Sequence, residues 1–353
     1  MEKRVEAIRA LMHDVDAVVV SSASNRFYLS GFKSSAGTVF ITKSRAFFVT
    51  DGRYFEAASK AVRHMDVVRG GQSVLRDIAE LCKAQQVSKL GFEDLETTVA
   101  VFNLYRDEMP EIELLPLGNR LLQLRACKDA NEVELIRRAQ TITDQAFLEV
   151  LNYIKAGRTE KECAKFLEDA MSRFGADAIA FPIIAVGGKN ASLPHGKPSE
   201  YALKEFDFLT MDFGAVYQGY VSDMTRTVAI GGTTEEMAIV YSTVLSAQEA
   251  ALAYAKPGVQ CRDVDKVARD LIAERGYGDC FVHSLGHSIG IDVHEKPGFS
   301  PLYDDLLQPG MCLTVEPGVY LPEKFGVRIE DDIVITEDGN QNLTTGPKAL
   351  LVL

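Results

Sequence analysis

Short apolar runs alternate with segments of helical spacing along the first third of the chain. Three of these runs are typical of buried strands: Val15–Val20, Val39–Ile41 and Ala46–Thr50. Leu75, Ile78 and Leu81 recur at helical spacing, and Leu90–Phe92 resumes an extended pattern. This alternation predicts an α/β domain over residues 1–124, ending near Leu121–Arg125.

Longer amphipathic helices follow. Asp129 and Glu132 have the spacing of a helix-capping pair, and one apolar stripe continues from Val133 to Ile154, ahead of Gly157. Capping residues and glycines delimit three further predicted helices: 159–174, 234–255 and 262–275. Because the segments between and after them are rich in strand-forming residues, residues 125–353 predict an α+β domain with helices flanking antiparallel strands.

Composition excludes several classes of function. The 38 Lys+Arg against 50 Asp+Glu give a net charge of −12, which argues against a protein that neutralises nucleic-acid phosphates. No apolar stretch approaches the roughly 18 residues of a membrane span, and the charged first residues lack a secretory core. The 6 cysteines are sparse and form no zinc-type pairs. We therefore expect a cytoplasmic protein with reduced thiols and neither a nucleic-acid nor a membrane partner.

The first chemical signal in the strand-rich part is a pair of aspartates. Asp212 and Asp223 flank a segment that would fold back on itself near Tyr217-Gln218. Such a hairpin sets the two side chains opposite each other, with their bases roughly 5 Å apart. Like charges there are destabilising unless a positive group lies between them.

A second pair repeats this arrangement. Glu316 and Glu330 flank a segment whose middle, Pro322–Lys324, is typical of a turn. Asp331 and Asp332 follow, but strand alternation directs Asp331 to the face opposite Glu330. Either pair alone could equally face solvent, and one buried pair could share a proton. Two pairs with a histidine cluster between them in sequence favour a site for two divalent cations, and oxygen ligands suit Mn²⁺, Co²⁺ or Zn²⁺.

Four of the 6 histidines lie among glycines, prolines and acids: His195, His283, His287 and His294. His195 belongs to a rigid loop, residues 193–198, ahead of the first acid-bearing strand. His283 and His287 are four residues apart, but nearby glycines disfavour a helix and the glutamate of a zincin motif is missing. On an extended strand they would lie roughly 13 Å apart. We therefore expect one to be a metal ligand and the other a proton donor in the substrate pocket.

Arg328 lies two residues before Glu330, so on an extended strand both side chains share a face. It could orient a carboxylate ligand or bind a substrate carbonyl or carboxylate. An ordinary structural ion pair is an equally simple alternative.

Six segments resemble, in order, the pita-bread metallopeptidases, and most closely their Xaa-Pro dipeptidase (prolidase) and Xaa-Pro aminopeptidase branch: Leu209–Ala215, Ser222–Thr227, His283–His287, Val293–Glu295, Val315–Gly318 and Val327–Glu330. Asn25–Phe32 is similar to a segment common in these enzymes, so the resemblance spans nearly the whole chain. It implies a creatinase-like amino-terminal domain at 1–124, a pita-bread catalytic domain at 125–353 and a homodimer.

The resemblance also implies a role for each candidate residue. The metal ligands would be Asp212, Asp223, His287, Glu316 and Glu330, with Asp223 and Glu330 bridging two ions, Mn²⁺ before Co²⁺ or Zn²⁺. A water or hydroxide between the ions would attack the scissile carbonyl, and Glu316 would shuttle the proton. His283 and His294 would stabilise the tetrahedral intermediate, and His195 would contact the substrate. The implied catalytic set is His195, His283, His294, Glu316 and Arg328.

The preferred function is a metal-dependent exopeptidase that hydrolyses the Xaa-Pro bond of dipeptides or short proline-containing peptides. A creatinase-type amidinohydrolase shares the fold but works without the metal ligands, and all five positions are filled here. Methionine aminopeptidases generally lack such an N-terminal domain, although release of other first residues stays open. The alternative from another class is a non-catalytic pita-bread binding protein, which usually loses metal ligands.

Overall fold

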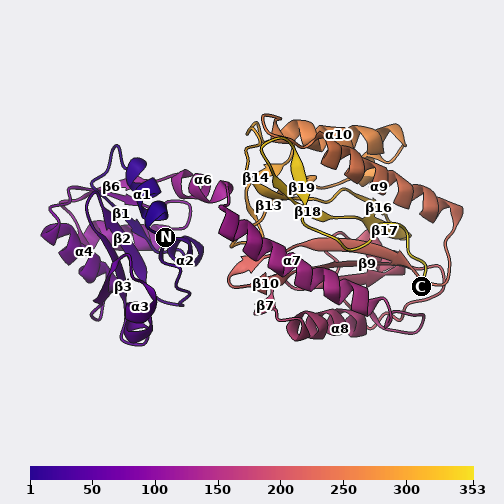
Figure 1. Ribbon diagram of the computed structural model, residues 1–353, viewed down its shortest axis with the longest axis horizontal. Helices are drawn as coiled ribbons and strands as arrows, with labels where there is room; N and C mark the ends of the chain where they lie inside the picture. Colours follow the sequence, from indigo (N-terminus) through magenta and orange to yellow (C-terminus); the bar gives the residue numbers. More distant parts are fainter. The chain divides into compact units, whose positions relative to one another are not determined.

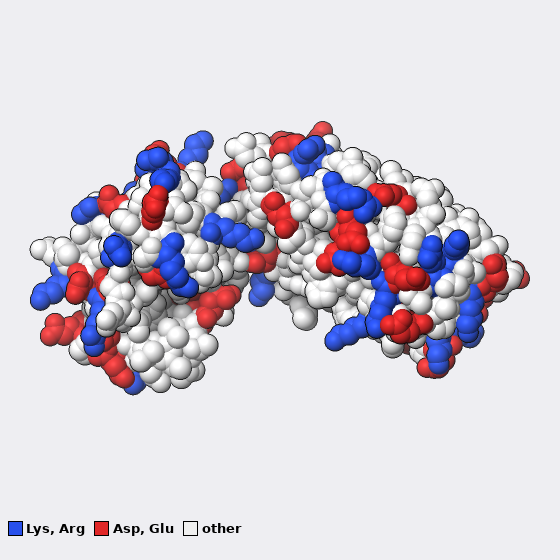
Figure 2. All heavy atoms as spheres, turned by 90° about the horizontal axis from the view of Figure 1, so that it is seen from below, with Lys and Arg blue, Asp and Glu red and all other residues white.

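The computed structural model describes residues 1–353, and the chain forms two compact units, Met1–Arg125 and Ala126–Leu353 (Figure 1). No helix in it combines the length and the apolar character that crossing a membrane requires. On the face seen in Figure 2, basic and acidic side chains are interspersed over both units.

The first unit is built on one six-stranded sheet in the order β4-β3-β2-β1-β5-β6. Its strands are β1 (Ala17–Val20), β2 (Thr38–Thr42), β3 (Ala46–Thr50), β4 (Asp66–Arg69), β5 (Lys89–Phe92) and β6 (Glu113–Pro116). Its helices are α1 (Glu2–Ala10), α2 (Ala23–Ser30), α3 (Phe55–Ala61), α4 (Val74–Ala84) and α5 (Val99–Glu108), with α6 (Arg120–Ala126) at the end. The strands expected from the apolar runs and the helix expected at Leu75–Leu81 are confirmed.

Burial explains this arrangement. Every residue of β1, β2 and β3 is buried, as continuous apolar runs require when both faces of a sheet are covered. Helix α4 contributes Ile78 and Cys82, both fully buried in the core that contains Phe40. The first unit is therefore the α/β domain that the sequence predicts.

The second unit carries four long helices: α7 (Ala130–Val150), α8 (Glu160–Arg173), α9 (Glu235–Tyr254) and α10 (Cys261–Glu274). Asp129 and Thr159 form complete capping boxes with Glu132 and Glu162, so the predicted starts are confirmed. The first of these helices ends at Val150, earlier than the stripe to Ile154 suggested. The chain turns at 151–153 and yet keeps Ile154 buried, which explains why the apolar pattern outlasts the helix.

The strands of this unit form antiparallel sheets. One has the order β12-β9-β8, one β11-β10-β7, one β14-β13-β15-β18-β19, and β16 pairs with β17. The bounds are β7 (Ala178–Ile179), β8 (Ile184–Gly187), β9 (Phe208–Phe213), β10 (Ala215–Tyr217), β11 (Tyr220–Val221), β12 (Met224–Ala229), β13 (Gly286–Ser288), β14 (Glu295–Phe299), β15 (Cys312–Val315), β16 (Gly318–Leu321), β17 (Phe325–Arg328), β18 (Asp331–Ile335) and β19 (Asn340–Asn342), with short 3₁₀ turns η1 (Gly188–Ser192) and η2 (Gly278–Cys280).

Two hydrophobic cores hold helices against these sheets (Figure 1). In one, Phe147 of α7 and Leu167 of α8 pack with Met211 of β9. In the other, Val244 of α9 and Val264 of α10 pack with the sheet that contains β15 and β18. The predicted α+β domain, with helices flanking antiparallel strands, is confirmed, and strands from both cores meet at the acid-bearing positions.

Candidate active site

The first pair of acids lies at the junction of two sheets. The turn is at Gln218-Gly219, whose φ values of 47° and 86° both lie in the left-handed region, as a two-residue hairpin turn requires. This turn is one residue later than predicted, so Asp212 pairs with Thr225 and not with Asp223. The predicted direct opposition of the two aspartates is therefore wrong by two residues.

Both aspartates nevertheless share a face, because Asp223 lies two residues before Thr225 along the chain. Gly214 allows the chain to pass from β9 into β10 at this point, since a Cβ there would lie 1.9 Å from the carbonyl oxygen of Ser222. The hairpin that carries Asp212 and Asp223 therefore depends on a position without a side chain.

The second pair follows the predicted register. Gly318 pairs with Arg328 in one ladder and Val315 pairs with Asp331 in the next. The same register continues between them, which places Glu316 across from Glu330. The turn falls at residues 322–324, where Glu323 has a φ of 59°. Because Pro322–Lys324 is recognisable as a turn, the sequence sufficed to place this pair.

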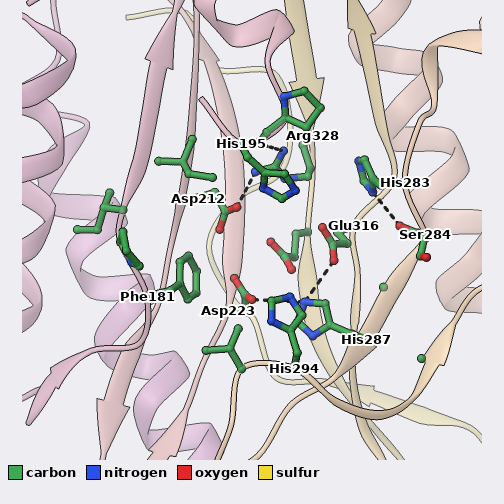
Figure 3. Close-up of a pocket in the computed structure, with 18 of the residues that line it drawn as sticks. Phe181, His195, Asp212, Asp223, His283, Ser284, His287, His294, Glu316 and Arg328 are labelled. Atoms are coloured by element: carbon green, nitrogen blue, oxygen red, sulfur yellow. Dashed lines mark hydrogen bonds and ion pairs between the residues drawn. The ribbon is translucent and has the colours of Figure 1, made fainter. Parts of the chain in front are cut away.

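One cavity of about 900 Å³ brings all the candidate residues together. Its lining includes Asp212, Asp223, His195, His283, His287, His294, Glu316, Arg328 and Glu330. In Figure 3 the two aspartates extend from the strands on one side of the cavity toward Glu316 and His287 on the other. The cavity thus lies between the two sheets that carry the two acid pairs.

The donor atoms at the floor of this cavity fit a divalent metal centre. Oxygen and nitrogen atoms of Asp223, His287 and Glu330 lie within 4.8 Å of one another. The His287 Nε2 atom lies 3.4 Å from Glu316 Oε1 and 3.7 Å from Asp223 Oδ2. Asp212 Oδ1 and Asp223 Oδ1 are buried without a hydrogen-bond partner. A buried polar atom without a partner lowers the stability of the folded protein. Divalent cations bind clustered carboxylates and would supply the missing partner.

The pKa shifts of the clustered residues also fit a metal centre. Burial, followed by the charges of neighbouring acids, raises the pKa of Asp223 and of Glu330 well above the usual range. Burial also raises the pKa of Glu316 to about 8. Burial lowers the pKa of His287 to about 4, which leaves its imidazole neutral, as a metal ligand must be. Bound cations would stabilise the ionised carboxylates that burial and mutual repulsion disfavour.

Hydroxyl groups orient the acids from the neighbouring strands. The Thr225 hydroxyl donates to Glu330 Oε2 at 2.6 Å, and the Thr314 hydroxyl donates to Glu316 Oε1 at 3.2 Å. Such contacts fix the direction in which a ligand presents its lone pairs. Neither threonine was predicted from the sequence. Their positions could have identified them, because each lies two residues from an acid of the site, on the same face of a strand.

Arg328 donates four side-chain hydrogen bonds to protein groups. Its guanidinium donates to Asp212 Oδ2 at 2.5 Å and to the Tyr320 hydroxyl at 2.7 Å. It also donates to Thr225 Oγ1 and to the carbonyl of Pro194, in the loop that carries His195. These contacts correspond to the orienting role among the alternatives that the sequence left open. Tyr320, which the sequence analysis did not single out, links Arg328 to His283.

His283 and His287 have different partners in the cavity, in line with the separate tasks that their spacing suggests. His287 lies in β13 with its ring centroid 4.3 Å from that of His294. His283 precedes this strand, and its Nδ1 contacts the carbonyl of Ser284 at 2.8 Å while Nε2 contacts the Tyr320 hydroxyl at 2.9 Å. Burial lowers the pKa of His283 to about 4. Because a neutral ring bonded in this way donates through Nδ1, its Nε2 accepts from Tyr320.

Comparison with known families defines the class of protein. Residues 134–337 match metallopeptidase family M24, and residues 4–127 match the creatinase/prolidase N-terminal domain. These matches and the metal-type cavity together define a metallopeptidase with a creatinase-type first domain.

Relatives of known structure match over the full length. The chain is 38% identical to an Xaa-Pro dipeptidase from Bacillus anthracis, with a TM-score of 0.97 over 99% of both chains. It is 36% identical to an X-Pro aminopeptidase from Thermotoga maritima, with a TM-score of 0.93 over 99% of this chain and 100% of the other. An Xaa-Pro dipeptidase from Pyrococcus furiosus is 34% identical over 99% of this chain and its own full length. The chain belongs to metallopeptidase family M24 and is a hydrolase of the prolidase type.

Proposed function

We propose that this metallopeptidase hydrolyses the Xaa-Pro bond of dipeptides or short peptides with two divalent cations. The observation that carries the proposal is the convergence of five oxygen and imidazole donors in one cavity, where Asp212 and Asp223 each leave a buried oxygen without a protein partner. The names of the relatives, Xaa-Pro dipeptidase and X-Pro aminopeptidase, support the choice of the scissile bond.

Five residues would hold the cations: Asp212, Asp223, His287, Glu316 and Glu330. We assign the bridging positions to Asp223 and Glu330, the two ligands with the most deeply buried carboxylates. Mn²⁺ is the favoured ion, because four of the five donors are hard carboxylates, and Co²⁺ and Zn²⁺ are alternatives. When bound, the cations would lower the pKa of a water molecule and stabilise negative charge on the substrate carbonyl oxygen.

The chain's own residues would position the substrate and move the proton. Glu316 would accept a proton from the attacking water and pass it to the leaving nitrogen. His294, whose exposed ring lies beside His287, would donate to the substrate carbonyl. His195, exposed on its loop at the cavity, would contact the substrate. His283 would donate through Nε2 only after a change of tautomer that releases Tyr320.

Arg328 would act by holding Asp212 in the orientation that a cation requires. In this assignment the arginine is a positioning residue and does not bind the substrate. The homodimer expected from the resemblance stays a prediction, which sedimentation of the purified protein would test.

The specificity is tested with two peptides. We expect protein stripped with chelator and restored with Mn²⁺ to hydrolyse an Xaa-Pro dipeptide. Release of the first residue from an Xaa-Pro-Xaa tripeptide would instead identify an aminopeptidase, the second candidate, which the Thermotoga maritima relative favours. Cleavage of neither peptide by Mn²⁺-loaded protein would contradict the proposed bond and turn the search to other first residues or to a binding role.

A further inference from the structure

The two halves of the candidate metal centre come from different sheets. Asp223 and Thr225 belong to the hairpin of β9 and β12, whereas Glu330 directly precedes β18 in another sheet. No ladder of paired residues joins β12 to β18. The distance between the two acid pairs therefore depends on whatever joins these two strands.

The backbone N–H of Glu330 donates to the Thr225 carbonyl at 3.1 Å, and one fully buried arginine reinforces that connection. Arg226 of β12 is 1% exposed and is the largest fully buried side chain of the protein. Its Nη1 donates to the carbonyl oxygens of both Thr225 and Glu330, at 2.9 and 2.5 Å. Its Nη2 donates to Asp331 Oδ1 at 2.8 Å. The guanidinium thus bonds to the backbone or side chain of residues on both strands.

The remaining donors of Arg226 are also in use. Nη2 donates to the carbonyl of Gly346 at 2.7 Å, and Nε donates to the carbonyl of Pro347 at 3.1 Å. All five N–H groups of a guanidinium are therefore satisfied. A lysine has only three donors, from one atom, and could not make these contacts together.

Asp331 holds the arginine from the second strand. Its Oδ2 accepts from Gln248, Asn342 and Lys348, at 2.8, 2.7 and 2.7 Å. The side chain is 1% exposed and lies on the face opposite the cavity, as strand alternation predicts. Each buried oxygen of this carboxylate has donors, so the Arg226–Asp331 pair has the complete partner set that a buried ion pair requires.

Side chains of β12 contact side chains at the start of β18 on both faces of the strands. Toward the cavity, the Thr225 hydroxyl donates to Glu330 Oε2. Away from it, the next residue of each strand, Arg226 and Asp331, form the ion pair. We propose that Arg226 and Asp331 are positioning residues that set the separation of the two halves of the metal centre, an inference that rests on the metal ligands assigned above.

The test is the affinity for Mn²⁺, measured by calorimetric titration of metal-stripped protein. Arg226→Lys keeps a positive charge beside Asp331 but cannot replace all five contacts of the guanidinium. We expect it to weaken Mn²⁺ binding about 10–100-fold, the range for residues that orient metal ligands. A folded Arg226→Lys protein with the affinity of the wild type would overturn the proposal.

A matched control separates positioning from general destabilisation. Glu160 is another fully buried acid, which accepts from Gly187, Asn190 and Ser199 and contacts no ligand. We expect Glu160→Gln to lower the temperature of unfolding of the metal-free protein and leave the Mn²⁺ affinity unchanged. An equal loss of affinity in both variants would show that Arg226 acts only through overall stability.

A milder variant applies if Arg226→Lys does not fold. Lys348 is 26% exposed and supplies one of the three donors to Asp331 Oδ2. We expect Lys348→Met to weaken Mn²⁺ binding by less than about 10-fold, because two other donors to Asp331 Oδ2 remain, and Lys348→Arg to keep the wild-type affinity. No change in Lys348→Met would overturn the proposal. Wild-type protein that binds Mn²⁺ but cleaves no Xaa-Pro peptide would contradict the proposed function alone, because this test does not use hydrolysis.

Discussion

Asp223 is buried among acids with one carboxylate oxygen unpaired, and its backbone N–H donates to the side chain of Asp332. Burial and the neighbouring carboxylates, Glu330 first, raise its pKa, so the metal-free site disfavours its ionised form. A residue in this state gains most from a cation that lies between the acids. This gain supports the bridging position that we propose for Asp223.

Asp223→Ala is therefore expected to lose both metal and activity. Even residues behind the ligands contribute about 10–100-fold to metal affinity, so loss of a bridging ligand should exceed about 100-fold. Elemental analysis of the purified variant gives the metal content, and hydrolysis of an Xaa-Pro dipeptide gives the activity. Full activity in this variant would contradict the dinuclear assignment.

Single residues were predictable where their chemistry is rare and their spacing regular. All the acids and histidines that line the cavity, except Glu295, were named as candidates from the sequence. Tyr320, Thr225 and Arg226 were not, because hydroxyls and arginines occur throughout soluble proteins. Their contacts with the site depend on how separate sheets pack, which no local pattern encodes.

At the scale of elements, the two hairpins differ in how clearly the sequence marks their turns. Pro322–Lys324 identifies one turn, and the register of Glu316 and Glu330 follows from it. The other turn was predicted near Tyr217-Gln218, but it lies at Gln218-Gly219, where both residues have a left-handed backbone. A shift of one residue in a turn moves the cross-strand partner by two.

Gly214→Ala tests the first hairpin. The added Cβ would lie 1.9 Å from the carbonyl oxygen of Ser222, so the backbone must move. Overpacking of this kind is worth about 1–3 kcal/mol, and we expect a lower temperature of unfolding together with weaker Mn²⁺ binding. Gly339→Ala is the matched control, because a Cβ there meets nothing within 4 Å. Equal stability of the two variants would contradict the role of Gly214.

The loop at residues 193–198 carries His195 to the cavity, while Arg328 holds it through the carbonyl of Pro194. We expect His195→Ala to lower kcat/KM about tenfold, equivalent to about 1.4 kcal/mol, with bound metal unchanged. His13→Ala, at an exposed histidine of the first unit, serves as control. Loss of metal in His195→Ala would show that its role is misassigned.

At the scale of the whole molecule, the pattern of apolar positions was informative about architecture. The change from short buried strands to long amphipathic helices falls near the boundary between the two units, after Arg125. The class of each unit followed from that pattern, because helical and strand periodicities extend over many residues. The sheet order in the second unit did not, since it depends on pairings between segments far apart in the chain.

The most direct test is hydrolysis of an Xaa-Pro dipeptide by metal-stripped protein as Mn²⁺ is added back in known equivalents. We expect no activity without metal and a rise that reaches its plateau at two equivalents for each chain. Activity that survives stripping, or that stays absent at saturating Mn²⁺, would contradict the assignment of a dinuclear Xaa-Pro peptidase.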